Sequence, residues 1–292
     1  MSVLFVQENM VAFYTGWLLL RPDITNMLVV KAVLRLARLA LFWSPQGSLK
    51  LKMWWSGAVM AVFRSILFNV LAFLLTLVMG VGAFPVRWFA HGLALPFAKL
   101  WSRLVLSLFQ TICGVEVRIT GQEHLATNGP LLIASQHQSA FDTLIWMLLV
   151  PAPSYVMKGE LRRIPLLGPM LILTGMMPIE RADGARALRI LLRETDTAVQ
   201  KGKQIIIFPE GTRTAPGEHV PLKPGIAAMA THTRLPVVPV ATNSGRFWGR
   251  NAFFKRSGVL HVAIGAPIGP ASRKVLLPQI EKEWRALEKE FS

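Results

Sequence analysis

His137 and Asp142 are two residues whose types and spacing could carry out acid–base chemistry. They lie in a polar turn between an apolar run over residues 131–134 and a second apolar run that begins at Leu144. An imidazole can take a proton from a hydroxyl near neutral pH, and a neighbouring carboxylate can fix its tautomer and stabilise the imidazolium. The pattern predicts a buried strand, a turn and a buried helix, with the pair at the strand end, where α/β folds usually bind substrates.

The separation of the two residues decides whether they can meet. Residues five positions apart on a regular helix point about 140° apart, since each residue turns about 100°. His137 and Asp142 can therefore meet only if His137 precedes the helix. Ser139 and Asp142 also match a capping box, in which Asp142 would bond the first amides of the helix. From this segment alone, Asp142 is either the partner of His137 or a helix cap.

A second group of candidate residues lies in FPEGTRT, residues 208–214, at the end of the apolar strand predicted over residues 204–208. Gly211 permits a tight backbone turn near a ligand, and the planar guanidinium of Arg213 suits a phosphate. Glu210 could hold Arg213 or bind hydroxyl groups. An ordinary strand-to-loop turn with a salt bridge is the structural alternative.

Four short blocks follow one another along the chain. They are HQSAFD (137–142), IER (179–181), FPEGTRT (208–214) and LPVVPVA (235–241). This order resembles the four-block pattern of the glycerolipid acyltransferases, specifically the 1-acyl-sn-glycerol-3-phosphate acyltransferase family, over about residues 110–270. The H-x4-D spacing alone is a weak signal, whereas H-x4-D followed by FPEGTR at this distance is a strong one.

The resemblance implies a role for each candidate residue. His137 would be the catalytic base and Asp142 the carboxylate that orients it. The residues that would bind the glycerol phosphate are Lys158, Arg181, Glu210, Gly211 and Arg213. Two or three cations converging on one phosphate fit its charge of nearly two, since arginine can bind phosphate through two parallel hydrogen bonds.

The activity that the resemblance implies is transfer of an acyl chain from acyl-CoA or acyl-carrier protein to the sn-2 hydroxyl of 1-acyl-glycerol-3-phosphate (lysophosphatidic acid), which makes phosphatidic acid. The lipid hydroxyl attacks directly, so neither a nucleophilic side chain nor a cofactor is implied. The same blocks serve relatives that acylate glycerol-3-phosphate, lysophospholipids or lyso-ornithine lipid. Two alternatives from other classes are a non-catalytic membrane lipid-binding protein and a hydrolase that pairs Ser135 or Ser139 with His137, although the chain has no G-x-S-x-G motif.

Composition argues against several kinds of site and partner. One cysteine, Cys113, excludes an internal disulfide, and the six scattered histidines contain no H-E-x-x-H pair, so no metal site is expected. The formal net charge is +16, but no basic run interleaved with aromatic residues and no nucleic-acid motif accompanies it, so we expect no nucleic-acid partner. Residues 1–120 carry 11 Lys or Arg against 3 Asp or Glu, which suits an anionic lipid surface.

Alternating strand and helix patterns predict the catalytic domain over residues 114–292. The predicted strands cover residues 115–120, 131–135, 155–157, 177–179, 204–208, 237–242 and 259–265, and the predicted helices cover residues 184–201, 225–233 and 272–291. This order predicts an α/β fold with a mixed sheet flanked by helices, preceded by an N-terminal helical membrane anchor.

The membrane anchor is predicted over residues 53–113. Residues 65–86 are 22 residues without a charge, which matches the roughly 20 residues that a helix needs to cross a bilayer. Gly82 and Pro85 should bend or stop this helix, and a second apolar segment covers residues 91–113. A single spanning helix and a hairpin that enters one leaflet and returns both fit this pattern.

Residues 1–52 are predicted to be a basic amphipathic extension. Lys31, Arg35 and Arg38 fall on one face of a predicted helix over residues 28–43, which fits a helix in a membrane interface or a core-packed helix with basic ends. The chain is 52% apolar, with a mean hydropathy of +0.44. We therefore expect a membrane-bound protein, in the inner (cytoplasmic) membrane with its catalytic domain facing the cytoplasm.

Overall fold

The computed structural model describes residues 49–125, 129–164, 167–180, 184–250 and 252–291. The predicted amphipathic helix over residues 28–43 and the predicted site residue Arg181 lie outside the described residues. The helices are α3 (Leu49–Phe89), α4 (Ala94–Cys113), α5 (Ala140–Leu149), α6 (Leu167–Leu173), α7 (Ala185–Gln200), α8 (Gly225–Thr233) and α9 (Arg273–Glu288). The strands are β1 (Val115–Thr120), β2 (Leu131–Ser135), β3 (Pro153–Lys158), β4 (Met177–Ile179), β5 (Gln204–Ile207), β6 (Val237–Thr242) and β7 (Gly258–Ile264).

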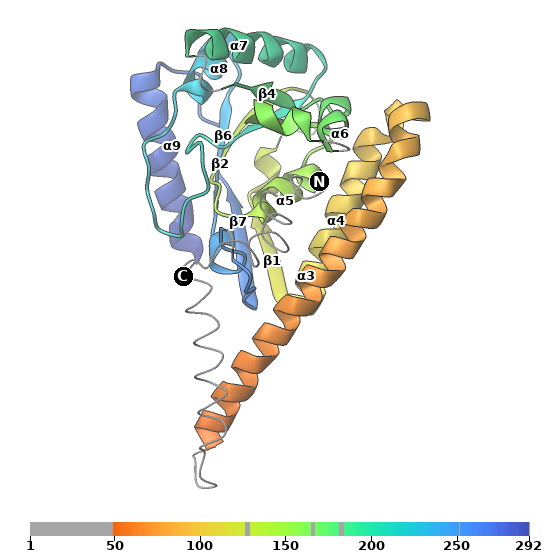
Figure 1. Cartoon of the computed structure of the whole chain (residues 1–292). Coiled ribbons are helices and arrows are strands. Elements are labelled where there is room, and N and C mark those ends of the chain that lie inside the picture. Colours follow the sequence, from red (N-terminus) through yellow and green to blue (C-terminus); the bar gives the residue numbers. More distant parts are fainter. Residues whose placement is uncertain (1–48, 126–128, 165–166, 181–183, 251, 292) are drawn as a thin grey trace.

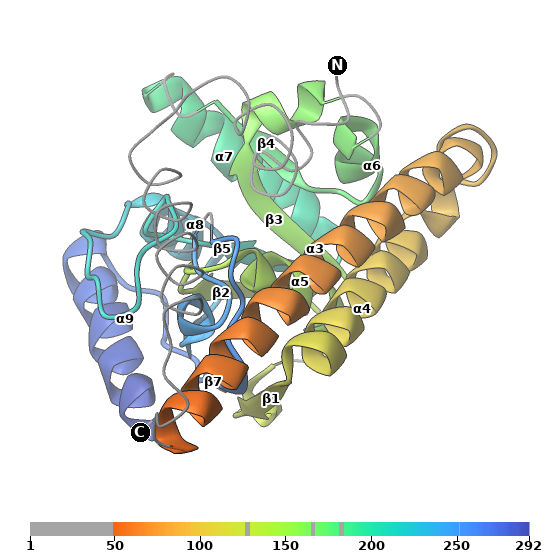
Figure 2. The same ribbon diagram turned by 60° about the horizontal axis from the view of Figure 1, so that its bottom comes forward.

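The strands form one sheet in the order β1-β7-β6-β2-β5-β3-β4. Figures 1 and 2 together label all of these strands. β6 and β7 are antiparallel and the other neighbouring pairs are parallel, so the predicted α/β fold with a mixed sheet is confirmed. In the central strand β2, Ile133 lies opposite Ile206 of β5 on one side and Val238 of β6 on the other. The run of parallel pairs from β4 to β6 places the carboxyl ends of these strands along one edge of the sheet.

Helices cover both faces of the sheet, which explains why its central strands are apolar on both sides. All residues of β2 are buried. Leu131 and Ile133 pack into a cluster with residues of α3, α4 and α5, whereas Leu132 and Ala134 pack into a cluster with residues of α7, α8 and α9. Alternate residues of one strand therefore supply two separate cores.

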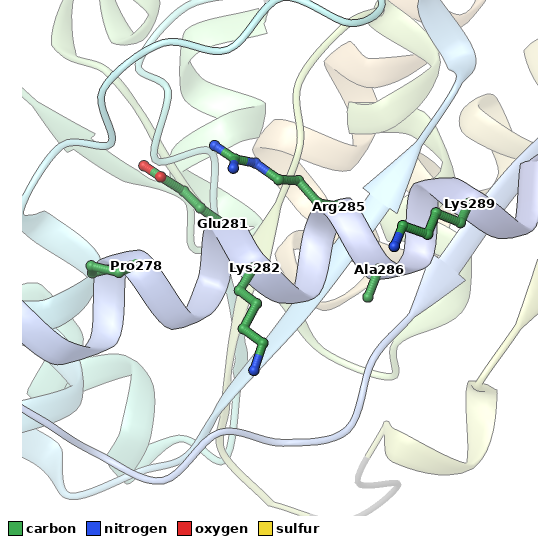
Figure 3. A pocket seen from close by; sticks show the side chains of 6 residues that line it. All are labelled: Pro278, Glu281, Lys282, Arg285, Ala286 and Lys289. Carbon is green, nitrogen blue, oxygen red and sulfur yellow. The ribbon is translucent and has the colours of Figure 1, made fainter.

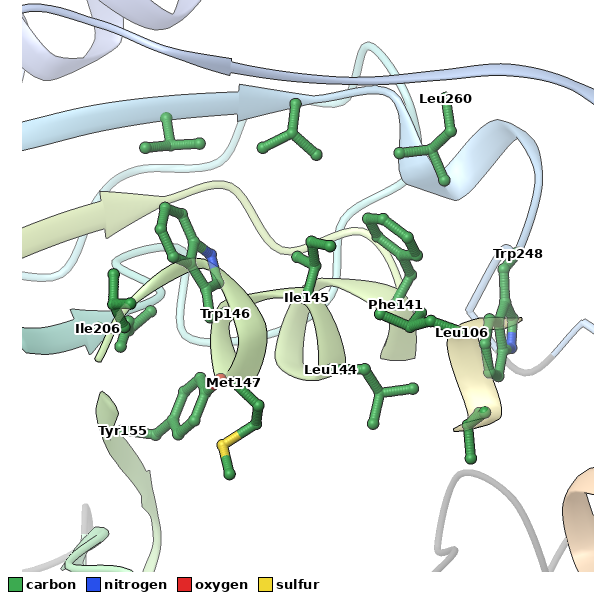
Figure 4. Close-up of a cluster of buried hydrophobic side chains, with 14 of the residues drawn as sticks. Leu106, Phe141, Leu144, Ile145, Trp146, Met147, Tyr155, Ile206, Trp248 and Leu260 are labelled. Carbon is green, nitrogen blue, oxygen red and sulfur yellow. The ribbon is translucent and has the colours of Figure 1, made fainter. Parts of the chain in front are cut away.

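Helix α5 brings several large side chains to the first of these cores. Phe141, Ile145 and Trp146 belong to the same buried cluster as Ile206 and Leu260 of the sheet (Figure 4). Phe141 and Trp146 are 0% and 1% exposed. Since a fully buried large apolar side chain stabilises a fold by about 1.5–3 kcal/mol, this packing holds α5 and the segment that leads into it.

α3 and α4 form an antiparallel hairpin that lies along one side of the sheet domain (Figures 1 and 2). Within the described chain, Val59–Phe89 and His91–Cys113 are long and apolar enough to cross a membrane, by length and composition. α3 and α4 therefore pack side by side as a helical hairpin, and the way in which it enters a membrane stays a prediction. Residues 52 and 53 both lie within α3, so the predicted boundary between them falls inside this helix.

The predicted interruption near Gly82 and Pro85 does not end the helix, because α3 runs through both residues to Phe89. Phe97 of α4 lies beside Gly82, where an added β-carbon would make an ordinary van der Waals contact of 3.4 Å with Phe97 Cζ. A helical glycine costs about 1 kcal/mol and a helical proline about 3 kcal/mol relative to alanine. Tertiary packing against α4 offsets these intrinsic costs.

Polar contacts join one face of α3 to the catalytic domain. Asn69 Nδ2 donates to Phe253 O at 3.0 Å, and Ser65 Oγ accepts a hydrogen bond from Lys255 N at 2.9 Å. Lys255 is 3% exposed, and its Nζ donates to Asn69 Oδ1 at 3.2 Å. The opposite face of the helix is apolar and exposed at Val59, Phe63, Ile66, Val70, Leu74, Leu77, Val78 and Val81. The helix is thus docked on the domain along one face and presents apolar side chains on the other.

Candidate active site

The predicted site residues lie at the carboxyl ends of neighbouring parallel strands. His137 follows β2, Glu210 and Arg213 follow β5, and Lys158 is the last residue of β3. Because these strands are parallel, the loops that follow them emerge on the same edge of the sheet. Arg181 follows β4 closely in the sequence but lies outside the described residues.

His137 and Asp142 meet because His137 precedes the helix, as their spacing requires. α5 begins at Ala140, with Ser139 as its N-cap. His137 Nδ1 lies 3.3 Å from Asp142 Oδ2, and the two side chains are 15% and 2% exposed. With Nδ1 on the carboxylate, Nε2 is the ring nitrogen that can serve as a base.

Asp142 also caps the helix, so both interpretations of the H-x4-D pattern hold for one carboxylate. Its Oδ2 accepts hydrogen bonds from Gln138 N and Ser139 N, each at 2.7 Å. Ser139 Oγ accepts a hydrogen bond from Phe141 N at 3.0 Å, which completes the capping box. The amide bonds therefore hold the buried carboxylate in place beside the imidazole.

Phe208 supports the imidazole of His137 on its flat side. The two rings are stacked, with centroids 4.1 Å apart and an interplanar angle of 21°. Tyr155 lies behind Phe208 with its ring centroid 6.4 Å away. The sequence marks Phe208 only as a strand end, since a ring contact between two separate loops leaves no signal in either loop. Stacking and the Asp142 contact together set the direction of Nε2.

Glu210 ties the loop after β5 to the segment that carries His137. Its carboxylate is buried, with Oε2 accepting a hydrogen bond from His137 N at 2.7 Å and Oε1 accepting one from Thr214 Oγ1 at 3.2 Å. Thr214 N donates to His137 O at 2.8 Å. The sequence pattern suggests Arg213 or a hydroxyl as the partner of Glu210. In the structure the carboxylate contacts the backbone of the predicted base and the hydroxyl of Thr214, and its contact with a substrate hydroxyl stays a prediction.

Burial raises the pKa of Glu210 to about 8, an effect that the hydrogen bond from His137 N opposes and the charge of Asp142 reinforces. Between about pH 4.5 and pH 8 the folded chain therefore keeps a proton on Glu210, whereas the unfolded chain, in which Glu210 has its ordinary pKa of 4.5, has released it. The contribution of this proton to stability is complete below about pH 4.5 and is lost as the pH rises through about 8.

Replacing Glu210 by glutamine will preserve the loop contacts and remove this pH dependence. A glutamine Oε1 can still accept from His137 N, and its Nε2 can donate to Thr214 Oγ1. Melting temperatures measured between about pH 6 and pH 9 should fall with pH more steeply for the natural chain than for Glu210→Gln. Glu210→Ala should be less stable at every pH, by about 1–3 kcal/mol, because it leaves the His137 amide unsatisfied.

The same variant separates a structural role for Glu210 from the substrate contact that the resemblance implies. If the carboxylate holds the loop, Glu210→Gln will keep most of its affinity for a glycerol phosphate. A glutamine variant that melts like the natural chain but binds glycerol phosphate much more weakly would show that the carboxylate contacts the substrate.

The remaining described candidates are Gly211 and Arg213, which follow β5, and Lys158, which ends β3. Gly211 has φ of 76° in the turn after β5, a left-handed conformation that favours glycine. Arg213 is partly buried; burial lowers its pKa, the charge of Asp142 opposes that shift, and Arg250 adds to it. Lys158 is exposed, with no side-chain hydrogen bond or ion pair to another described residue. The structure thus brings His137, Asp142 and Glu210 into one network, whereas Lys158 shares only the edge.

The two serines that could serve a hydrolase are engaged elsewhere. Ser135 Oγ donates to Gln136 O and accepts a hydrogen bond from Trp146 Nε1, both at 3.1 Å. Ser139 Oγ is the helix cap, and both residues are buried. These contacts favour direct attack by a substrate hydroxyl over a serine nucleophile.

Two further features of the described chain bear on the site. No group of three His, Cys, Asp or Glu side chains within it could hold a metal ion. An open pocket of about 400 Å³ lies along α9 and is lined by Pro278, Glu281, Lys282, Arg285, Ala286 and Lys289 (Figure 3). These residues are separate from the His137 network, which α9 reaches instead through Glu288, the acceptor of a 2.6 Å hydrogen bond from Gln136 Nε2.

The part of the chain that carries the candidate residues is similar to a known protein family. Residues 116–243 match the family model described as Acyltransferase. The matched span starts in β1 and ends just after β6, so it contains the loops after β2, β3 and β5 that carry the candidate residues.

Individual relatives match over a similar region. A 1-acyl-sn-glycerol-3-phosphate acyltransferase of Pseudomonas aeruginosa is 33% identical over 165 residues, covering 56% of this chain and 64% of that protein. A protein of the same name from Limnanthes douglasii is 30% identical over 172 residues, covering 58% of this chain and 60% of that protein. The chain thus spans less than two thirds of the length of these curated relatives.

A solved structure shares the arrangement of the elements. The crystal structure of the 1-acyl-sn-glycerophosphate (LPA) acyltransferase from Thermotoga maritima gives a TM-score of 0.57 at 23% sequence identity. The likeness covers 77% of this chain and 98% of that one. At this level of identity it establishes a common fold.

Proposed function

We propose that the chain, whose residues 116–243 match the Acyltransferase family model, transfers an acyl group from a thioester to a lipid hydroxyl. The observation that carries this proposal is the contact between His137 Nδ1 and the buried carboxylate of Asp142 at the end of β2. It supplies a base whose tautomer and direction are set in advance.

The proposed reaction uses His137 Nε2 to remove the proton of the acceptor hydroxyl as its oxygen attacks the thioester carbonyl carbon. Asp142 stabilises the imidazolium that forms. The tetrahedral intermediate then collapses, the C–S bond breaks, and the leaving thiolate takes the proton from His137. One ester forms, one thioester is consumed, and the base returns to its neutral form.

We propose lysophosphatidic acid as the acceptor and phosphatidic acid as the product, with acyl-CoA or acyl-carrier protein as donor. The names of the matching relatives support this acceptor. Two cationic side chains support it too, since Arg213 and Lys158 lie on the same sheet edge as His137. Arg181 remains a predicted third cation.

The hairpin of α3 and α4 supports attachment to a membrane. Its exposed apolar face is continuous along α3, and its other face is docked on the catalytic domain. A lipid acceptor would then reach the site from the bilayer that holds the enzyme. We propose the inner (cytoplasmic) membrane, with the site facing the cytoplasm, where soluble thioester donors are available.

An acceptor panel tests the proposed substrate. The full chain in detergent would receive labelled oleoyl-CoA or oleoyl-acyl-carrier protein together with lysophosphatidate, glycerol-3-phosphate, lysophosphatidylcholine or monoacylglycerol. We expect lysophosphatidate to react fastest and monoacylglycerol, which lacks the phosphate, to react poorly. Faster transfer to another lysolipid would change the acceptor, and intact thioesters in every arm would favour a non-catalytic lipid-binding protein.

A further inference from the structure

Arg250 reaches the predicted phosphate site from a loop that lies outside the four sequence blocks. It lies in the connection between β6 and β7, residues 243–257. Its Nη1 donates a hydrogen bond to Arg213 O at 3.3 Å. The Arg250 guanidinium, from the connection after β6, therefore contacts the backbone of Arg213 in the loop after β5.

These two guanidinium groups lack acidic partners in the part of the chain that the structure describes. The ion pairs found there include neither Arg213 nor Arg250. The two carboxylates of the site are committed to other groups, with Asp142 on His137 and two amides, and Glu210 on His137 N and Thr214. Burial lowers the pKa of the partly buried Arg213; the charge of Asp142 opposes this shift, and the like charge of Arg250 adds to it. An anion bound between them would offset these like charges.

The loop that carries Arg250 is held on both sides. Before Arg250, Gly245 N donates to Gln138 Oε1 at 3.1 Å, in the segment between His137 and α5. After it, Lys255 N donates to Ser65 Oγ of α3. Trp248 packs against Phe68 of α3 with ring centroids 5.2 Å apart. Arg250 is thus presented by a loop that is fixed to both the catalytic segment and the anchor.

We infer that Arg250 is a further phosphate-binding residue, which acts with Arg213 to hold the phosphomonoester of the acceptor. The inference rests on the proposed function and names a residue outside the blocks that the sequence identifies. Two guanidinium groups suit a phosphomonoester, which carries nearly two negative charges and can bind each arginine through paired oxygens. A phosphodiester with a cationic headgroup, as in lysophosphatidylcholine, matches them less well. Arg250 would therefore also contribute to the choice of acceptor.

Substitutions at Arg250 test this inference against an exposed arginine of the same loop. We expect Arg250→Ala and Arg250→Gln to raise the KM for lysophosphatidate by about 10- to 100-fold, the effect of losing one charge-assisted hydrogen-bonding group. The kcat and the KM for oleoyl-CoA should change by less than about 2-fold. Arg250→Lys should recover part of the affinity. Arg246→Ala, which removes the same charge from the same loop, should behave as the natural chain does.

Several results would overturn the inference. Arg250→Gln behaving as the natural chain would show that the positive charge of Arg250 does not hold the phosphate. An increase confined to the KM for oleoyl-CoA would assign Arg250 to the donor. An equal loss in Arg246→Ala would reduce the effect to general surface charge. Unchanged melting temperatures would show that each variant is folded.

Equilibrium binding of glycerol-3-phosphate, measured without thioester, separates this inference from the proposed function. Binding that weakens at least about 10-fold in Arg250→Gln, in a protein that transfers no acyl chain, would refute the function and support the site. Efficient acyl transfer with glycerol-3-phosphate binding that is unaffected by Arg250→Gln would refute the site and support the function.

Discussion

Replacing His137 by alanine is expected to lower kcat for acyl transfer by about 10²–10⁴-fold, the usual contribution of one general base. The loss should fall on kcat, because His137 Nε2 acts on the hydroxyl proton as the ester bond forms. The KM for lysophosphatidate and the binding of glycerol-3-phosphate should change little. Steady-state kinetics at several acceptor concentrations would separate the two effects.

A second His–Asp pair offers a matched control for this variant. His232 Nε2 lies 2.8 Å from Asp196 Oδ1 on the surface between α8 and α7, where the side chains are 40% and 48% exposed. His232→Ala removes the same kind of pair from residues of α7 and α8, outside the candidate site, and should leave kcat unchanged. Equal losses of kcat in both variants would show that the effect of His137→Ala is not specific to the site.

Replacing Asp142 is expected to reduce both activity and stability, and the choice of substitute separates the two. Asp142→Ala removes the acceptor of Gln138 N and Ser139 N, and each unsatisfied buried amide costs about 1–3 kcal/mol. Asp142→Asn keeps an oxygen that can accept from these amides but removes the charge beside His137. It should therefore retain most of the stability while kcat still falls by about 10²–10⁴-fold.

Thermal unfolding and kcat measured on both Asp142 variants check this expectation. If the carboxylate serves only as a helix cap, Asp142→Asn will be nearly as active as the natural chain. If it orients His137 as well, Asp142→Asn will be folded and nearly inactive. The single oxygen that contacts His137 and both amides makes the second outcome the expected one.

Local sequence patterns are sufficient to predict the central strands of the sheet, because strands buried on both faces read as apolar runs. The strand predicted over residues 237–242 and the helix predicted over residues 225–233 have the bounds of β6 and α8. The passage of α3 through Pro85 is not predictable in this way. It depends on packing against α4, and a proline within an apolar run indicates a break when only its neighbours are considered.

The candidate site is predictable where its members are close in sequence. His137 and Asp142 lie five residues apart, so helix geometry alone decides how they can meet. The contacts of Phe208 with His137 and of Arg250 with Arg213 cannot be predicted from the sequence. In each contact the two residues follow different strands, and the residues around them form no pattern that indicates the contact. Glu210 is identified by its block, but its contact with His137 N is not, since a backbone amide leaves no pattern in the sequence.

A single-turnover experiment tests the central claim most directly. The full chain, in excess over oleoyl-labelled CoA, would be mixed with lysophosphatidate and quenched over time, with the label followed in lipid and in protein. We predict that the label passes to phosphatidate without appearing on the protein, and that His137→Ala leaves it on CoA over the same interval. Labelled protein that forms before the lipid product, or equal rates in the two chains, would contradict direct attack assisted by His137.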